Sequence, residues 1–245
     1  MATIILNGVE NNTNPLAGST DLNDKLTVSG GSANYEADMQ GGSDHVEIDQ
    51  AGEDVTEAKI AGGDGDDLIE VDNSAFEAKS FSGTLSGGLG DDTIGVGVGD
   101  VKDTTTGMVT LTGRAAGNAG DDYIKIIRAE GATVQAGADD DYVEIGDFSP
   151  ADGPGSRGDT TIVDTSVNGG SGDDDITVLY AAKLTDTTIN GGEGIDSIYI
   201  DGDLASETAV VVTNNTDGST TISADSVVKA GGDEDKIYLQ GALDN

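Results

Sequence analysis

Hydrophobic residues recur at every second position in a short block that returns along most of the chain. Each block follows a ten-residue frame, whose clearest copy runs from Gly62 to Val71. All copies carry an aspartate at the sixth position and aliphatic residues at the eighth and tenth. These aliphatic pairs are Leu26/Val28, Val46/Ile48, Ile69/Val71, Ile94/Val96, Ile124/Ile126, Val143/Ile145, Ile176/Val178, Ile198/Ile200 and Ile237/Leu239. Alternation with a period of two, mostly in β-branched residues, predicts a half-buried strand after each loop.

A second short strand is expected before most loops. The residue two places before the loop is aliphatic at Ile60, Leu85, Val134, Val167, Ile189 and Val228. Successive sixth-position aspartates lie 19 to 39 residues apart, whereas two strands with two turns need about 18 to 20 residues. We therefore predict an all-β fold, a right-handed parallel β-roll or β-helix solenoid of about nine coils with one Gly/Asp loop per coil. The excess residues are expected in irregular return loops on the opposite edge.

The repeats predict a single domain over residues 1–245. Its parts are an N-terminal cap with a degenerate first coil (1–38), the core coils (39–200), an insertion (201–229) and the last coil with the C-terminal end (230–245). Within the insertion, 209–223 is expected to form a hairpin that turns near Asp217-Gly218. Because solenoid ends are exposed edges, this insertion and the strand from Thr3 to Leu6 are candidates for capping or assembly.

The composition fits a thin aliphatic core and excludes several functions. The chain has 38 Gly, 3 Phe and no Trp, and its 47 acidic residues against 11 Lys and Arg give a formal net charge of −36. This charge repels nucleic acids and anionic membrane surfaces. No run of 18 apolar residues occurs, so we expect no membrane insertion. The absence of Cys excludes disulfides and thiolate metal sites.

The loops combine the residue types that a calcium site needs. Glycine permits positive φ, which lets backbone carbonyls turn toward one centre, and Ca²⁺ takes six to eight oxygen ligands from carbonyls and carboxylates. Stacked strands repeat every ~4.8 Å, so successive sixth-position carboxylates should lie close together. At that spacing two charges repel by ~1 kcal/mol in water and by ~3 to 4 kcal/mol at an effective dielectric constant of 20. A divalent ion would offset this repulsion, and we expect the calcium-free chain to be largely unfolded.

Three copies, residues 62–70, 87–95 and 169–177, resemble the RTX (repeats-in-toxin, haemolysin-type) nonapeptide GGxGxDxUx, in which U is a large aliphatic residue. The resemblance covers roughly residues 39 to 239 and implies a calcium-dependent parallel β-roll with roughly six to eight ions between stacked loops. It implies carboxylate ligands at the sixth position, namely Asp44, Asp67, Asp92, Asp122, Asp141, Asp174, Asp196 and Asp235. The other implied site residues, which include carbonyl donors, are Gly62, Gly63, Asp64, Gly65, Gly87, Gly88, Gly90, Gly117, Gly120, Gly137, Asp139, Gly169, Gly170, Gly172, Gly191, Gly192, Gly194, Gly231 and Asp233.

The chain departs from ordinary RTX tandems, which repeat every nine residues and bind ions along both edges. Its copies are spaced singly, so ions are expected along one edge only. Asp139 and Asp233 stand where the motif has glycine, so their two loops match it less well. An acidic loop with a purely structural role is the alternative interpretation.

Little in the sequence supports catalysis. The single histidine, His45, lies at an outward strand position and is expected on the surface. Without Cys, any Ser-His-Asp or Cys-His site would have to use it. Zinc-hydrolase motifs are absent, and the recurrence of paired aspartates favours metal ligation or solvated charge over acid/base catalysis. We therefore expect neither an enzyme nor a small-molecule substrate.

Two further features could contact a partner. Outward tyrosines stand at Tyr123, Tyr142, Tyr199 and Tyr238. They can mark a contact between subunits, but packing between neighbouring coils is the simpler interpretation. The tripeptide Arg157-Gly158-Asp159 is attributed to chance in a chain so rich in Gly and Asp.

Two functional classes fit these predictions. The first is a calcium-binding structural or assembly protein of an extracellular surface layer, matrix or filament, folded by calcium after export. The second is a virion structural protein, such as a phage capsid decoration or tail component, built on the same fold. Both imply self-association or docking to a larger protein assembly. An enzyme with an RTX tail is disfavoured because the loops leave no room for a catalytic domain.

Overall fold

The structure is a computed structural model in which every regular element of the described residues is a β-strand. It describes residues 3–7, 23–29, 36–50, 54–73, 79–97, 109–146, 160–185, 187–202, 209–213, 220–221, 225–229 and 236–240. Side-chain environments are described for those of these residues that lie between 23 and 200, except residues 160–161 and 179–185. No helix in this described part is long and apolar enough to cross a membrane.

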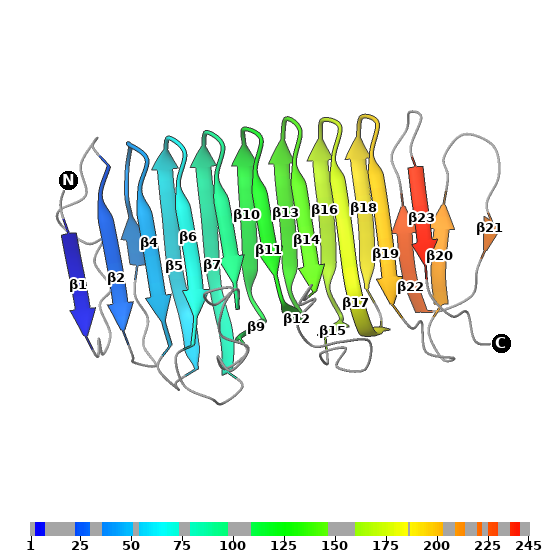
Figure 1. The fold of residues 1–245 in the computed structure, drawn as a ribbon, viewed down its shortest axis with the longest axis horizontal. Helices are drawn as coiled ribbons and strands as arrows, with labels where there is room; N and C mark the ends of the chain where they lie inside the picture. The colour runs from blue at the N-terminus through cyan, green and yellow to red at the C-terminus, as the bar shows by residue number, and fades with distance from the viewer. Residues whose placement is uncertain are drawn as a thin grey trace.

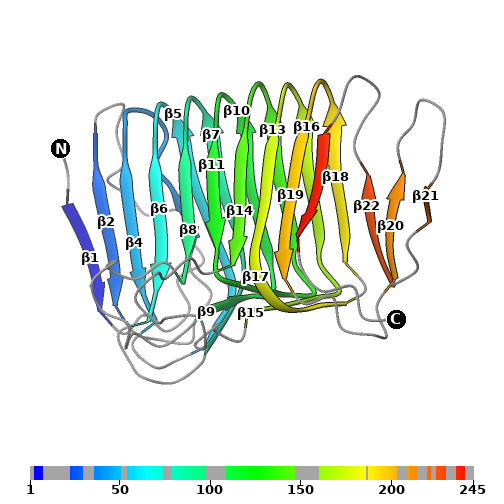
Figure 2. The same cartoon turned by 45° about the vertical axis from the view of Figure 1, so that its right-hand side comes forward.

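Parallel strands form two sheets, one from the strands before the Gly/Asp loops and one from the strands after them (Figures 1 and 2). The pre-loop row contains, in order, β3 (Glu36–Asp38), β5 (Val55–Asp64), β7 (Lys79–Leu89), β10 (Arg114–Ala119), β13 (Thr133–Ala138), β16 (Ser166–Ser171), β18 (Thr188–Glu193), β22 (Asp225–Lys229) and β20 (Ala209–Thr213). The post-loop row contains β1 (Thr3–Asn7), β2 (Lys25–Ser29), β4 (His45–Asp49), β6 (Leu68–Asp72), β8 (Thr93–Val96), β11 (Tyr123–Ile126), β14 (Tyr142–Gly146), β17 (Asp175–Thr185), β19 (Ser197–Gly202) and β23 (Lys236–Gln240).

Part of the return segments is also strand, and here the expectation of irregular return loops is wrong. The short strands β9 (Val109–Leu111), β12 (Arg128–Glu130) and β15 (Thr160–Val163) pair in parallel with one another. The start of β7 and the end of β17 extend this set. Leu111, Ala129 and Ile162 are fully buried. The return segments therefore bury apolar side chains of their own, and this burial stabilises the pairing of their strands.

The insertion near the C-terminal end contains an antiparallel pair. β20 pairs antiparallel with β21 (Thr220–Thr221), with Val212 opposite Thr220, and parallel with β22. This is the segment in which the sequence predicts a hairpin. The predicted turn at Asp217-Gly218 and the tripeptide at 157–159 lie outside the described residues.

The core consists of the aliphatic positions that the repeat predicts. In the eight copies with described side chains, from Leu26 to Ile200, the eighth and tenth residues are 0–2% exposed. Ile60, Leu85, Val134, Val167 and Ile189, before the loops, are 0–1% exposed. The predicted inward pattern is thus confirmed here, and burial of each such side chain contributes ~1.5–3 kcal/mol. The side chains of Val228, Ile237 and Leu239 lie outside the described part.

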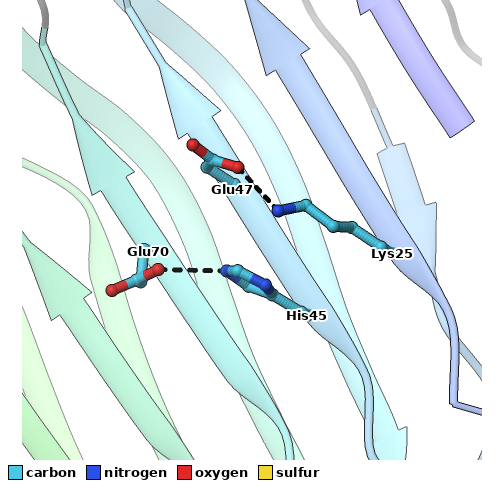
Figure 3. Close-up of polar contacts among 4 residues, drawn as sticks. All are labelled: Lys25, His45, Glu47 and Glu70. Carbon is cyan, nitrogen blue, oxygen red and sulfur yellow. Dashed lines mark hydrogen bonds and ion pairs between the residues drawn. The ribbon is translucent and has the colours of Figure 1, made fainter. Parts of the chain in front are cut away.

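The outward positions of the post-loop row carry polar and aromatic contacts between neighbouring strands. Tyr123 and Tyr142 are register partners whose ring centroids lie 5.4 Å apart. They pack on each other, in agreement with the simpler interpretation of the tyrosines. His45 Nε2 lies 3.0 Å from Glu70 Oε2, both on this face (Figure 3). Both side chains are partly exposed, as expected for a surface histidine.

Candidate metal centre

The Gly/Asp loops turn their first and sixth residues inward and their third and fifth residues toward solvent. In the loop from Gly169 to Asp174, these two end residues are buried, whereas Ser171 and Asp173 are exposed. The same burial pattern recurs at Gly62–Asp67 and Gly87–Asp92. The sixth-position side chain therefore continues the inward alternation of the strand that follows it, two residues before the buried aliphatic position.

Close stacking of successive loops explains the glycines at the second and fourth positions. Gly170 has φ +134° and Gly172 has φ +132°, a region that favours glycine. A Cβ at either residue would overlap a backbone carbonyl of the preceding loop, that of Gly137 or of Asp139. Non-glycine residues adopt positive φ at three equivalent positions, namely Gln40, Asn118 and Asp139. Asp139 thus takes the conformation of the glycine that it replaces.

A different contact explains the glycine at the first position. A Cβ there would overlap Oδ2 of the sixth-position aspartate in the same loop. This holds at Gly62, Gly87, Gly117, Gly169 and Gly191. Met39 and Ala136 occupy the first position in two other loops and are buried. In those two loops the first residue therefore carries a side chain that the five glycine loops lack.

The sixth-position aspartates form a continuous hydrogen-bonded ladder, which we call the inner ladder. The backbone N–H of each donates to Oδ1 of the next, over distances of 2.5–3.0 Å. The ladder runs through Asp24, Asp44, Asp67, Asp92, Asp122, Asp141, Asp174 and Asp196. All eight side chains are 1–3% exposed. The predicted proximity of the sixth-position residues, including Asp24 of the degenerate first copy, is confirmed for these eight.

The second carboxylate oxygen has no such bond in most of the inner ladder. Oδ2 is buried without a hydrogen-bond partner, within the described residues, in Asp44, Asp67, Asp92, Asp122, Asp141 and Asp174. Burial raises the pKa of Asp67 and Asp122 to about 6, of Asp92 and Asp174 to about 7, and of Asp141 to about 8. The backbone N–H bond opposes this rise, and neighbouring carboxylates add to it. Each buried oxygen therefore favours a proton or a cation.

Backbone carbonyls lie beside these oxygens in at least two loops. The position that a Cβ on Gly169 would take is close to both Asp174 Oδ2 and the Gly191 carbonyl oxygen, and the same holds for Gly117 with Asp122 Oδ2 and the Ala136 carbonyl. In all five described strand pairs from β5–β7 to β16–β18, the residues on either side of the first loop position are register partners, whereas the first-position residues themselves are not paired. Carboxylate and carbonyl oxygens together suit a hard cation such as Ca²⁺.

Side chains alone do not assemble a metal site in the described part of the chain. No group of three or more His, Cys, Asp or Glu residues there could hold an ion. The inner ladder presents one carboxylate per loop, so a cation would need backbone carbonyls for the rest of its ligands. This donor set agrees with the glycine-rich sequence, since glycine frees the carbonyls to turn.

The fifth-position residues form a second ladder, the outer ladder, that sequence reasoning missed. Six fifth-position backbone N–H groups donate to Oδ1 of the same position in the preceding loop, over 2.8–3.2 Å. The step from Ser43 to Asp66 is the exception, because serine has no Oδ1. The acceptors are Asn23, Asp66, Asp91, Asp121, Asp140 and Asp173, all exposed. The signal was the recurrence of aspartate just before the sixth position.

Some predicted site residues lie apart from the buried carboxylates. Asp64 and Asp139 stand at exposed positions of their loops, so the structure does not bring their side chains to the inner ladder. Gly231, Asp233 and Asp235 lie outside the described residues. β19 and β23 pair in register from Ser197 with Lys236.

No protein family model matches this chain, and no curated protein or solved structure matches it either.

Proposed function

We propose that the chain is a calcium-binding structural protein and not an enzyme. In this proposal its strands form coils of a parallel β-roll solenoid, and Ca²⁺ binds between successive Gly/Asp loops. The carboxylates of the inner ladder and the carbonyls of the first, second, fourth and sixth positions would supply the ligands. The bound ions would neutralise the buried charge and lock neighbouring coils together.

One observation carries this proposal, namely the row of buried Oδ2 atoms without partners. A buried carboxylate oxygen that accepts no hydrogen bond costs several kcal/mol unless a proton or a cation compensates it. A single such atom could be a local defect. Its repetition in six loops, from Asp44 to Asp174, indicates a common ligand. In four of these loops the first residue is glycine, and a Cβ there would overlap the buried oxygen.

The cellular role that fits best is a component of an extracellular surface layer, matrix or filament. Calcium outside cells is at millimolar concentration, which suits weak sites that act together. A stack of coils joined by ions is stiff along its length, and a stiff repeated unit suits assembly. The net charge of −36 favours binding of cations over binding of nucleic acid.

Native mass spectrometry of the chelator-treated protein, titrated with Ca²⁺ and separately with Mg²⁺, tests the proposal. We expect several Ca²⁺ ions to bind, roughly six to eight, whereas Mg²⁺ should bind less because it demands small octahedral sites. The control is the double variant Asp91→Asn/Asp121→Asn in the outer ladder, which should keep the wild-type number. Absence of Ca²⁺ adducts above the Mg²⁺ background would contradict the proposal.

A further inference from the structure

One face of the structure lacks the acidic residues that dominate the chain. The four neighbouring strands β7, β10, β13 and β16 contain no Asp or Glu, and Lys79 and Arg114 are their only charged residues. In the whole chain, 47 of 245 residues are acidic. The outward side chains of these strands form what we call the acid-free face. They are Thr84, Ser86, Arg114, Ala116, Asn118, Thr133, Gln135, Ser166 and Asn168.

The acid-free face carries mainly amides and hydroxyls, which both donate and accept hydrogen bonds. Some of them already bond along the row. Arg114 Nη2 donates to Gln135 Oε1 over 2.5 Å, and Asn118 Nδ2 donates to Ser86 Oγ over 2.9 Å. These bonds hold the side chains in place and leave further donor and acceptor capacity directed outward. A hollow of about 310 Å³ is lined by Arg114, Asn118, Gln135 and Asn168 and by the small Ala116.

The outward face of the post-loop row differs in charge. Lys25 Nζ lies 3.0 Å from Glu47 Oε2, and Lys125 Nζ lies 2.8 Å from Glu144 Oε1. His45 and Glu70 also lie close together on this face, and Figure 3 shows the pairs Lys25–Glu47 and His45–Glu70 on neighbouring strands. The loop edge, in turn, carries the exposed carboxylates of the outer ladder. Two copies that met through the loop edge would bring like charges together, which is unfavourable.

We propose that the acid-free face binds the same face of a second copy of the chain. This inference rests on the proposed structural role. A symmetric contact places a surface against itself, so the surface must complement its own groups. Amides and hydroxyls meet this requirement because each is donor and acceptor, whereas a row of carboxylates does not. The hollow on this face provides room for a side chain of the second copy.

The size of the face sets the strength of the contact. Four strands at ~4.8 Å and about six residues at ~3.3 Å give roughly 400 Å² per copy. A stable interface buries ~800 Å² per partner. Leu89, 57% exposed at the loop end of β7, adds apolar surface at the margin. One contact is therefore weak in solution and gains strength where many copies are aligned in an assembly.

Sedimentation velocity over a wide protein concentration range, in ~0.15 M salt with calcium, tests this contact. The test variant is Gln135→Glu/Asn168→Asp, in which both oxygens still accept their bonds from Arg114 and Asn190. The matched control, Asn23→Asp/Ser43→Asp, adds two carboxylates at exposed fifth positions, where other loops already have aspartate.

We expect the sedimentation coefficient of the wild type and the control to rise with concentration, while the test variant stays monomeric with an unchanged circular dichroism spectrum. A wild type that stays monomeric throughout, or a test variant that associates like the wild type, would overturn the inference. Calcium-dependent circular dichroism of the same samples separates the two proposals. Association without any calcium response contradicts calcium binding alone, whereas a calcium response without association contradicts the contact alone.

Discussion

Adjacent aspartates in one loop occupy opposite environments. Asp92, in the inner ladder, is 2% exposed, and its Oδ1 accepts a hydrogen bond from the preceding loop. Asp91, in the outer ladder, is exposed, and its Oδ1 accepts a hydrogen bond from the following loop. This loop is thus tied to its neighbours in both directions by two carboxylates that are one residue apart. The inward or outward direction of the strand pleat decides which of the two is buried.

Residue type alone therefore does not define the site. The second oxygen of an outer-ladder carboxylate can bond to water, so its charge costs little. The second oxygen of an inner-ladder carboxylate is enclosed, so its charge must be compensated. The inner ladder is therefore the place where a proton or a cation affects stability, and substitutions or pH changes that act on one ladder alone should separate the two.

The dependence of stability on pH should be the strongest effect, because several groups act together. The inner-ladder pKa values are raised to about 6 to 8 in the folded chain, against a value near 3.8 in the unfolded chain. In chelator, stability should therefore be greatest below about pH 4 and should fall as pH rises to about 8. Each group loses at most roughly 1.4 kcal/mol for every pH unit between its unfolded and folded pKa values.

Excess calcium should reverse this dependence between pH 4 and 8, because protons compete with the cation for the same oxygens. Urea unfolding at several pH values, with chelator and with calcium, measures both slopes. Equal slopes under the two conditions would mean that the inner ladder holds no cation.

The next effect concerns the stacking of loops on which both ladders depend. Gly170→Ala places a Cβ against the Gly137 carbonyl at φ +134°, so we expect a loss of at least ~2 kcal/mol from strain and overlap. Gly131→Ala is the matched control, since its φ is +63° and nothing lies within 4 Å. It should cost about 1 kcal/mol from strain alone. Equal losses in urea unfolding would show that the loops are not in contact.

A smaller effect separates ligation from a purely structural acidic loop. Asp92→Asn keeps the acceptor oxygen but removes the charge. In chelator this variant should be at least as stable as the wild type, whereas in calcium it should lose ~1–3 kcal/mol of stabilisation. Asp91→Asn should change the free energy of unfolding by less than ~0.5 kcal/mol, both in chelator and in calcium. If Asp92→Asn is stabilising with calcium present as well, the carboxylate is not a ligand. Thermal unfolding under both conditions gives the comparison.

The weakest effect concerns the one described loop whose first position is alanine. Ala136 carries a methyl group at the position where a Cβ in five other loops would overlap the carboxylate. Ala136→Gly should cost ~0.5–1 kcal/mol in chelator, as glycine does in a strand, and should increase the calcium-dependent gain in stability. Ala138→Gly, two residues further in the same strand, provides the control without such an increase. An equal calcium response in both variants would show that the methyl does not restrict the site.

Much of the core and of the inner ladder could be predicted from the sequence repeat. Aliphatic residues at two fixed positions after each loop, such as Ile94 and Val96, specify both the strand and its buried face. Burial of the sixth position follows from the same alternation, because Asp92 lies two residues before Ile94. The return segments could not be predicted in this way. Their lengths vary, and Leu111 and Ala129 pair across strands with no sequence period to mark them.

The direction of the hydrogen bonds in the two ladders also could not be predicted from the sequence. Whether the Asp92 carboxylate accepts from the preceding or the following loop depends on how the loops stack, and stacking is a relation between residues that lie 25 or 30 positions apart. The absence of acidic residues from β7, β10, β13 and β16 was visible in the sequence. Only the pairing of these strands shows that they form one continuous face.

Far-UV circular dichroism of the chelator-treated chain, titrated with Ca²⁺ and in parallel with Mg²⁺, is the most direct test of calcium binding by the inner ladder. We expect Ca²⁺ to increase the β signal and to raise its thermal midpoint cooperatively, and Mg²⁺ to have little effect. Ca²⁺ accepts irregular sets of carboxylate and carbonyl oxygens, whereas Mg²⁺ demands a small octahedral site. A full β signal in excess chelator that Ca²⁺ leaves unchanged, together with an unchanged thermal midpoint, would contradict calcium binding and leave the aspartate loops with a purely structural role.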